Sequence, residues 1–298
     1  MILAISVMLK IHSFFMTNLA MALEKDSATG SAGWPGNVQL LNFAQFLVFP
    51  TLTYEASFPR SPSIRPSYLL WKAAQGGIAI VVGFSVLFFS VIPILAHPTP
   101  PASLSALPSR LQAPIAFLLD LTRLALPSIC CWCAVFVGFF SCCLGILAEL
   151  TRFADREFFG PWWEAQSIGA FWSSWNAPVH KWAKRHLLLE LQIYLHLKRR
   201  GAVLATFLLS ALLHEVIIST AFKTIRPYFF FAMLFQLPLI SLSRVLQGEG
   251  RHAAGGLGNS LVWLSLFLGQ PVLELLYARE FLLQNGHRTG RDLLCLSQ

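Results

Sequence analysis

The residues best suited to chemistry are His214 and Glu215, side by side in the middle of the apolar segment Gly201–Phe222. Ionisable groups are costly inside a lipid bilayer, so they tend to face the protein interior or a wet cavity. Thr206, Ser210 and His214 recur every four residues and therefore share one face of a helix. This polar face predicts a histidine directed into a polar tunnel within the membrane. The alternative is a histidine that only hydrogen-bonds between helices.

A second group of reactive side chains lies in an aromatic stretch, Phe158–His186, where Asn176, His180 and Lys181 are interleaved with indole rings. Trp is enriched at the headgroup level of membranes, so anchoring at the interface is the simplest interpretation. Amide and basic groups beside flat rings are also what an adenine nucleotide with phosphates requires. Five tryptophans belong to the stretch: Trp162, Trp163, Trp172, Trp175 and Trp182.

The composition indicates which solvent surrounds the elements that position these residues. Of 298 residues, 55% are hydrophobic and 12% are charged, whereas an ordinary soluble domain has roughly 25% charged residues. A helix that spans a bilayer needs about 20 mostly apolar residues. The sequence therefore predicts an all-α, polytopic transmembrane helical bundle that encloses an intramembrane reaction chamber. Six segments are predicted to span: Met1–Leu23, Trp71–Ala96, Pro114–Leu150, Gly201–Phe222, Tyr228–Leu246 and Leu257–Phe281.

Two further segments are predicted to lie at the membrane surface. Trp182–Lys198 has leucines and a tyrosine at helical spacing with charged residues elsewhere around the helix, which predicts an amphipathic helix along the cytosolic interface. Leu40–Tyr54 is apolar but short and broken by Pro50, which predicts an interfacial or re-entrant element.

The net charge of +8 fits a membrane topology and not a nucleic-acid surface. Connections rich in Lys and Arg alternate with poor ones, and the rich ones are expected in the cytosol. We expect no nucleic-acid partner, because the basic residues do not form one stripe with exposed aromatic rings. Ser57–Lys72 and Thr151–Arg200 are rich, whereas His97–Ala113 and Lys223–Pro227 are poor.

The six cysteines do not predict a metal site. Cys130 and Cys133 have a CxxC spacing, but no second Cys or His pair stands where a zinc site would need it. We therefore expect no metal ligands and no cofactor, and thiols that act as small hydrophobic side chains.

Five motifs follow one another between about Lys10 and Phe281: FPTLTYEASFPRSPSIR at Phe49–Arg65, FFGPWWE at Phe158–Glu164, SWNAPVHKW at Ser174–Trp182, SALLHEVIIS at Ser210–Ser219 and NSLVWLSLFLGQP at Asn259–Pro271. In this combination the chain resembles the diacylglycerol and sterol acyl-CoA acyltransferase branch of the membrane-bound O-acyltransferases. The resemblance implies a single acyltransferase domain over residues 1–298, with residues 151–200 as a cytosolic acyl-CoA-binding loop and amphipathic helix. It also implies a multi-pass protein of the endoplasmic reticulum membrane and leaves a homo-oligomer, dimer or tetramer, open.

The resemblance implies roles for particular residues. His214 corresponds to the family's proposed general base, and Asn176 to the second residue that the family usually needs. An acyl thioester is already reactive, so the enzyme must mainly deprotonate an alcohol and align it. An amide N–H from Asn176 would stabilise the developing oxyanion, a contribution of about 3 kcal/mol in other acyl transfers. The residues expected to bind substrate are Trp162, Trp163, Trp175, His180, Lys181, Ser210, Glu215 and Gln270.

The chain departs from the family in its cytosolic FYxDWWN motif. Phe159 replaces the Tyr, Pro161 the Asp and Glu164 the final Asn, whereas Trp162 and Trp163 remain. YEASFPRSP and NAPVHKW look like the diacylglycerol subgroup, so we expect acyl-CoA and diacylglycerol as substrates and triacylglycerol as product. A sterol acceptor, a catalytically degenerate relative and, less favoured, a transporter remain alternatives.

The number of spans also leads to an expectation about the N-terminus. If the connections rich in basic residues are cytosolic, Met1–Leu23 enters from the lumen, which requires an odd number of earlier spans. The family branch has about nine spans and six are found here, so three N-terminal spans are expected to be missing.

Overall fold

The structure is a computed structural model, and it describes residues 1–23, 34–247 and 255–295. The described residues form helices and loops, with a single isolated β-bridge between Arg60 and Phe153 and no strand among them. The all-α prediction is therefore confirmed.

Six helices are long and apolar enough to cross a membrane, at nearly the predicted positions. The described part of the chain is thus a multi-pass membrane protein, and the large apolar side chains exposed along these helices are those that lipid would cover. The third predicted span forms one helix of 42 residues, which is longer than the roughly 20 residues that one crossing needs. The six are Ile2–Leu23, Pro66–Ala96, Ser109–Leu150, Arg199–Phe222, Tyr228–Leu246 and Gly256–Phe281.

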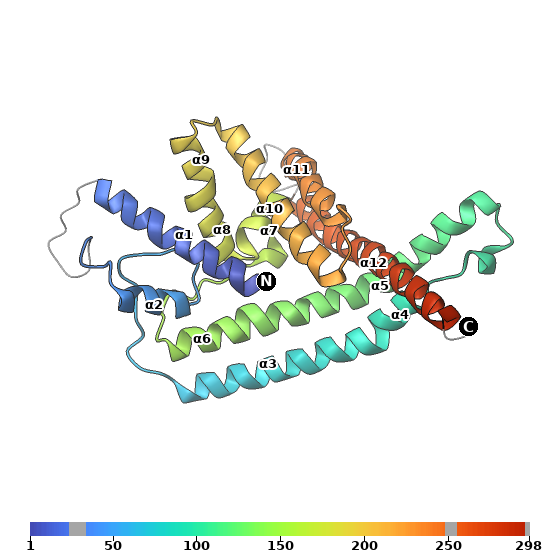
Figure 1. The fold of residues 1–298 in the computed structure, drawn as a ribbon, viewed down its shortest axis with the longest axis horizontal. Coiled ribbons are helices and arrows are strands. Elements are labelled where there is room, and N and C mark those ends of the chain that lie inside the picture. The colour runs from blue at the N-terminus through green and yellow to red at the C-terminus, as the bar shows by residue number, and fades with distance from the viewer. Residues whose placement is uncertain (24–33, 248–254, 296–298) are drawn as a thin grey trace. The chain divides into compact units, whose positions relative to one another are not determined.

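Two of these long helices, Pro66–Ala96 and Ser109–Leu150, contain a π-helical stretch. The order along the chain (Figure 1) is α1 (Ile2–Leu23), α2 (Leu40–Val48), α3 (Pro66–Val86), π-helix η1 (Leu87–Val91), α4 (Ile92–Ala96), 3₁₀-helix η2 (Pro101–Leu104), α5 (Ser109–Phe136), π-helix η3 (Val137–Cys143), α6 (Leu144–Leu150), 3₁₀-helix η4 (Trp162–Glu164), α7 (Ile168–Ser174), α8 (Ala177–Ala183), π-helix η5 (Lys184–Leu188), α9 (Leu189–Tyr194), α10 (Arg199–Phe222), α11 (Tyr228–Gln247) and α12 (Gly255–Cys295). These elements fall into two compact units, Met1–Gly77 with Val137–Leu209 and Ile78–Phe136 with Ser210–Gln298, which are described separately below.

In the first unit, α2 lies beside α1 (Figure 1), and the side chain of a lysine in α1 contacts the C-terminal end of α2. Lys10 is buried, and its Nζ donates to the carbonyl oxygens of Phe46 (3.0 Å), Leu47 (2.8 Å) and Phe49 (2.6 Å). The last carbonyls of a helix have no partner within that helix and carry partial negative charge. One ammonium group therefore satisfies the end of α2, which stops before Pro50 as the sequence predicts.

A buried carboxylate holds the first unit together at the end of α6. Glu149 is fully buried and accepts from the backbone N–H of Arg65 (2.6 Å) and from its Nη2 (2.8 Å). The Nη1 of Arg156 lies 2.6 Å from the same carboxylate. These two arginines surround Glu149 with positive charge and tie the start of α3 to the loop that follows α6.

The helix predicted over Trp182–Lys198 starts and ends earlier, because α8, η5 and α9 follow one another without a break from Ala177 to Tyr194. On its apolar side Leu187, Leu188 and Leu191 are half-buried, whereas Tyr194 is 51% and Leu195 is 63% exposed. A second face, which the sequence did not reveal, is buried through Trp182 and His186. The indole Nε1 of Trp182 donates to the carbonyl of Leu9 on α1 at 2.9 Å.

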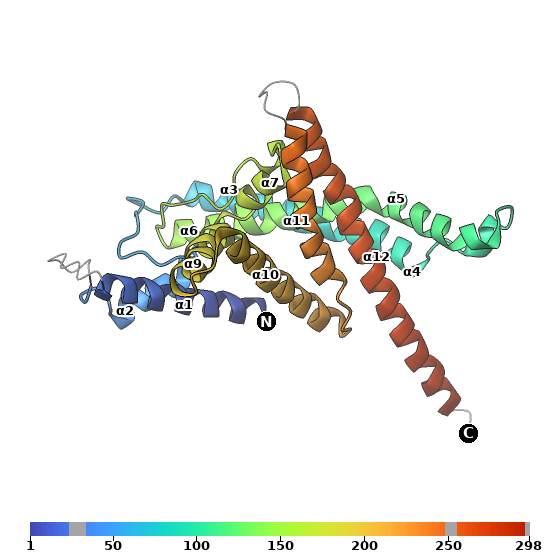
Figure 2. The ribbon, with the colours of Figure 1, turned by 90° about the horizontal axis from the view of Figure 1, so that it is seen from above.

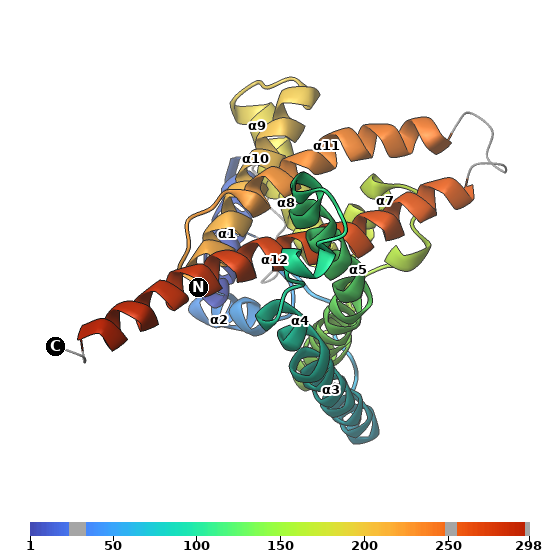
Figure 3. The same ribbon diagram turned by 90° about the vertical axis from the view of Figure 1, so that its right-hand side faces the viewer.

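In the second unit, α12 packs against α5 and α11, and α11 and α12 lie side by side in the perpendicular views of Figure 2 and Figure 3. A cluster of buried apolar side chains joins η1, α4, α5 and α12: Val91, Ile94, Leu121, Leu124 and Leu275. Next to it, the fully buried carboxylate of Asp120 accepts from Thr99 Oγ1 (2.6 Å) and Arg279 Nη2 (3.2 Å). This ion pair links the loop after α4 to α5 and α12.

Candidate functional site

The second unit fixes both the tautomer and the ring orientation of His214. Its Nδ1 lies 2.7 Å from the carbonyl oxygen of Ser210, one helical turn earlier. A carbonyl only accepts hydrogen bonds, so Nδ1 carries the proton in this contact and Nε2 retains its lone pair. The ring stacks on Phe229, with centroids 5.4 Å apart and an angle of 6° between the planes. His214 is half-buried, and the described residues offer Nε2 no hydrogen-bond partner.

Glu215 has a different task from its neighbour, since its carboxylate is buried against α11 and α12. It accepts from Ser219 Oγ (2.6 Å), from the backbone N–H of Phe230 (3.0 Å) and from the hydroxyl of Tyr277 (2.9 Å). A negative charge at the first turn of α11 is stabilised by the free N–H groups and by the helix dipole. Glu215 therefore anchors the junction between α10 and α11, and its expected role in substrate binding stays a prediction.

Tyr277, on α12, is a residue of this site that sequence reasoning missed. Its buried hydroxyl donates to Glu215 and accepts the backbone N–H of Phe229 at 3.1 Å. Phe229 is the residue on which His214 stacks, so Tyr277 positions the imidazole through the backbone of its stacking partner. The sequence feature that could have pointed to Tyr277 is that it is the one tyrosine in an apolar segment, seven residues after Gln270.

Gln270, also on α12, hydrogen-bonds away from His214. Its Nε2 donates to Glu274 at 3.3 Å, and Glu274 also accepts from Ser128 of α5 at 2.8 Å. Of the predicted residues in the second unit, Ser210, His214 and Glu215 come together around the α10–α11 junction. Gln270 belongs to a separate polar chain with Glu274 and Ser128.

In the first unit, Asn176 caps α8 and leaves its amide donor free. Its Oδ1 accepts the backbone N–H of Val179 at 3.3 Å, which is the contact expected of an N-cap asparagine. Because the oxygen is the atom in this contact, the NH₂ group is directed away from the helix end. The described residues give Nδ2 no hydrogen bond, so the donor that the oxyanion role requires is not consumed by the cap.

The predicted tryptophans form a continuous aromatic cluster beside this cap. Trp162 is buried and meets Trp163 edge to face at 5.7 Å, and Trp175 lies parallel to Phe171 at 6.3 Å. Trp163 is 41% exposed, which leaves part of its ring available to a ligand. The cluster fixes the loop that leads into α7 and α8.

The basic residues of the same region are at the surface. Lys181 pairs with the exposed carboxylates of Asp155 (3.6 Å) and Glu157 (3.7 Å). His180 is also exposed, and partial desolvation together with the nearby Lys184 lowers its pKa. At the altered end of the cytosolic motif, Glu164 accepts from the indole of Trp163 at 3.2 Å, so the substituted residue has a local partner.

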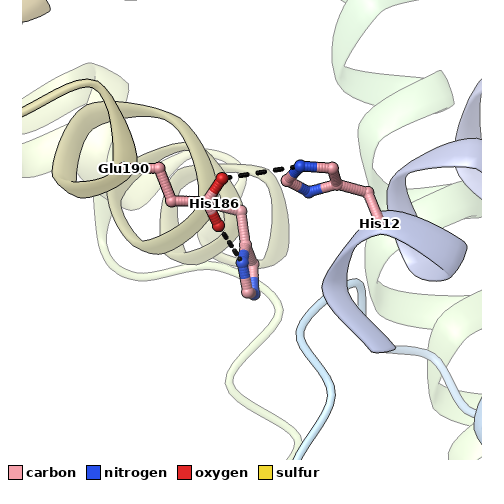
Figure 4. A group of neighbouring side chains, drawn as sticks. All are labelled: His12, His186 and Glu190. Atoms are coloured by element: carbon pink, nitrogen blue, oxygen red, sulfur yellow. Dashed lines mark hydrogen bonds and ion pairs between the residues drawn. The ribbon is translucent and has the colours of Figure 1, made fainter. Parts of the chain in front are cut away.

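One cluster has the chemistry of a metal site, and it contains neither a cysteine nor a residue predicted to be functional. His12 of α1, His186 of η5 and Glu190 of α9 point toward one another (Figure 4). Glu190 lies 2.9 Å from His186 Nδ1 and 3.5 Å from His12 Nε2. Burial lowers the pKa of His186 to about 4 and raises that of Glu190 to about 7, because desolvation disfavours the charged form of each.

The fold and these residues define a polytopic helical membrane protein with an oriented histidine in one apolar helix and an asparagine at the N-cap of another helix. A family model described as MBOAT, membrane-bound O-acyltransferase family, matches residues 2–279. The chain belongs to the membrane-bound O-acyltransferase family.

Relatives with assigned names support this membership. The chain is 34% identical over 264 residues to diacylglycerol O-acyltransferase 1 of Dictyostelium discoideum, which covers 86% of this chain and 40% of the relative. It is 35% identical over 295 residues to diacylglycerol O-acyltransferase 1A of Glycine max, and this match covers 96% of this chain and 57% of the relative. It is also 34% identical over 264 residues to diacylglycerol O-acyltransferase 1 of Homo sapiens, and this match covers 87% of this chain and 50% of the relative. The chain spans about half the length of the curated relatives it matches.

Proposed function

We propose that this protein is an acyl-CoA-dependent O-acyltransferase that transfers a fatty acyl group to the free hydroxyl of diacylglycerol and forms triacylglycerol. The proposal includes residence in the endoplasmic reticulum membrane. Its acceptor is supported by the names of the three relatives given above, each of which is a diacylglycerol O-acyltransferase. The observation that carries it is the tautomer of His214, whose Nδ1–H is held by the carbonyl of Ser210.

In the proposed reaction, Nε2 of His214 takes the proton of the acceptor hydroxyl as the oxygen attacks the thioester carbonyl. The amide N–H of Asn176 donates to the oxyanion that forms. The carbon–sulfur bond then breaks, the ester is released, and the imidazolium returns its proton to the leaving CoA thiolate. The proton count balances, and the imidazole ends in the neutral form in which it began.

The chemistry needs a base that is neutral and correctly turned before substrate arrives. A carbonyl acceptor on Nδ1 disfavours the alternative tautomer, and the Phe229 ring restricts rotation about χ2. In a serine protease, a buried carboxylate holds the catalytic histidine in the correct tautomer and orientation. For His214 the orienting group is a neutral backbone oxygen.

The experiment is an acyl-transfer assay on membranes that contain the full chain, with labelled oleoyl-CoA and with diacylglycerol and cholesterol tested side by side. We expect labelled triacylglycerol in excess over sterol ester, and no product from His214→Ala although that variant inserts and accumulates. His97→Gln is the matched control, because His97 is an exposed histidine outside the site and should leave the rate unchanged. Turnover by His214→Ala would refute the base, and a preference for cholesterol would refute the acceptor.

A further inference from the structure

The cluster of His12, His186 and Glu190 in the first unit contains ligand types that bind a transition metal. Each residue offers one ligand atom, and these atoms all lie within 4.8 Å of one another. We propose that they form a binding site for a divalent zinc-class ion, separate from the residues assigned to acyl transfer. Two imidazoles and one carboxylate, with a water molecule as fourth ligand, are a common zinc ligand set.

The distances agree with such a site. Zinc binds nitrogen and carboxylate oxygen at about 2.0–2.2 Å with tetrahedral geometry, which separates neighbouring ligand atoms by roughly 3.3 Å. Oε1 of Glu190 lies 2.9 Å from Nδ1 of His186, and the other carboxylate oxygen, Oε2, lies 3.5 Å from Nε2 of His12. The side chain of His12 is 40% exposed, so it has the freedom to close the remaining gap.

A second layer of contacts orients the most buried ligand. The Nε2 of His186 lies 2.8 Å from Ser13 Oγ, and the same oxygen accepts the backbone N–H of Tyr54 at 2.7 Å. Ser13 is fully buried, so this partner is fixed. With Nε2–H donating to Ser13, the lone pair of Nδ1 is directed at Glu190 and at the ion. Histidine ligands of zinc usually donate their other ring N–H in this way.

The ligand chemistry also selects the class of ion. Calcium and magnesium prefer sets made of oxygen atoms, whereas imidazole nitrogen favours zinc and its transition-metal neighbours. The bound ion would join α1 to the η5–α9 helix across more than 170 positions of sequence, as the contact between Ser13 and His186 already does.

The test uses the purified full chain in detergent, stripped with a chelator and then titrated with zinc alone. We expect one zinc per chain, a higher melting temperature with zinc than without, and the visible spectrum of tetrahedral Co²⁺ when cobalt replaces zinc. His12→Gln and Glu190→Gln should each lower zinc affinity more than about tenfold. Glu157→Gln is the matched control, because the side chain of Glu157 is 84% exposed.

A rescue variant separates a ligand from a residue that merely packs. Glu190→His replaces one zinc ligand by another, so it should recover zinc binding that Glu190→Gln has lost. The proposal would be overturned if the wild type, His12→Gln and Glu190→Gln bound zinc with equal affinity. It would also be overturned if the wild type bound no more zinc than a double variant that carries both His12→Gln and Glu190→Gln.

Discussion

Replacing Tyr277 by phenylalanine tests whether α12 positions the imidazole of His214. The substitution removes one oxygen and keeps the ring, so the packing of this buried side chain is preserved. It deletes the 2.9 Å contact with the carboxylate of Glu215 and leaves the N–H of Phe229 without its 3.1 Å acceptor. The stacking partner of His214 is then tied down by fewer bonds.

The size of the effect follows from those two bonds. Hydrogen bonds inside membrane proteins contribute about 0.6 kcal/mol on average and about 1.7 kcal/mol at most. Glu215 keeps its bonds from Ser219 and Phe230, so it is not left as an unpaired charge. We therefore expect Tyr277→Phe to lower the free energy of unfolding by about 1–3 kcal/mol. A shift of the imidazole by 1 Å would lower kcat by about 100-fold, so we expect a fall of roughly 10- to 100-fold.

The assay measures kcat and KM for oleoyl-CoA in membranes, beside the melting temperature of the purified variant. A positioning role predicts that kcat falls while KM changes little. Tyr228→Phe is the matched control, because it removes a hydroxyl that bonds Glu280 near the surface at 3.1 Å. If Tyr277→Phe keeps wild-type kcat, or if both variants lose activity equally, the positioning argument is refuted.

Substitutions at three further residues test other contacts. Asn176→Asp keeps the capping oxygen and loses the amide donor, so we expect kcat to fall 10²–10³-fold with nearly unchanged stability, whereas Asn176→Ala should also lose about 1 kcal/mol of stability. Wild-type kcat in Asn176→Asp would exclude the oxyanion role. Asp120→Asn should lower the free energy of unfolding by about 3 kcal/mol, because it breaks a buried ion pair with a partly exposed arginine, and an unchanged melting temperature would contradict this. Glu149→Gln should speed tryptic cleavage after Arg152 and Arg156, and cleavage at the wild-type rate would show that the carboxylate does not hold that loop.

The spans could be predicted from the sequence because length and apolarity alone determine them. The six segments counted by hydrophobic length match the six apolar helices, and the expected break of the helix before Pro50 is present. His214 could be singled out for the same reason, since an ionisable side chain in an apolar helix is conspicuous. These features depend on neighbours in sequence.

Contacts between distant segments could not be predicted. The contacts of Glu215 at the α10–α11 junction are an example, because adjacent residues on a helix point in different directions and its carboxylate meets Tyr277, 62 positions away. The buried face of α8–η5–α9 was missed because a π-helical turn changes the register on which a 3.6-residue period depends. His12 could not be singled out from its neighbours in the sequence, because its partners His186 and Glu190 are more than 170 residues later.

The bonds of Lys10 to the end of α2 have a consequence for biosynthesis. An isolated lysine in the middle of a helix opposes entry into the bilayer by about 2.5–3.5 kcal/mol in insertion by the translocon. Its three carbonyl partners belong to residues 36 to 39 positions further along the chain, so they do not exist when α1 first leaves the ribosome. We expect α1 to remain shallow or to wait at the translocon until α2 has been translated, and the two helices to enter the membrane as one unit.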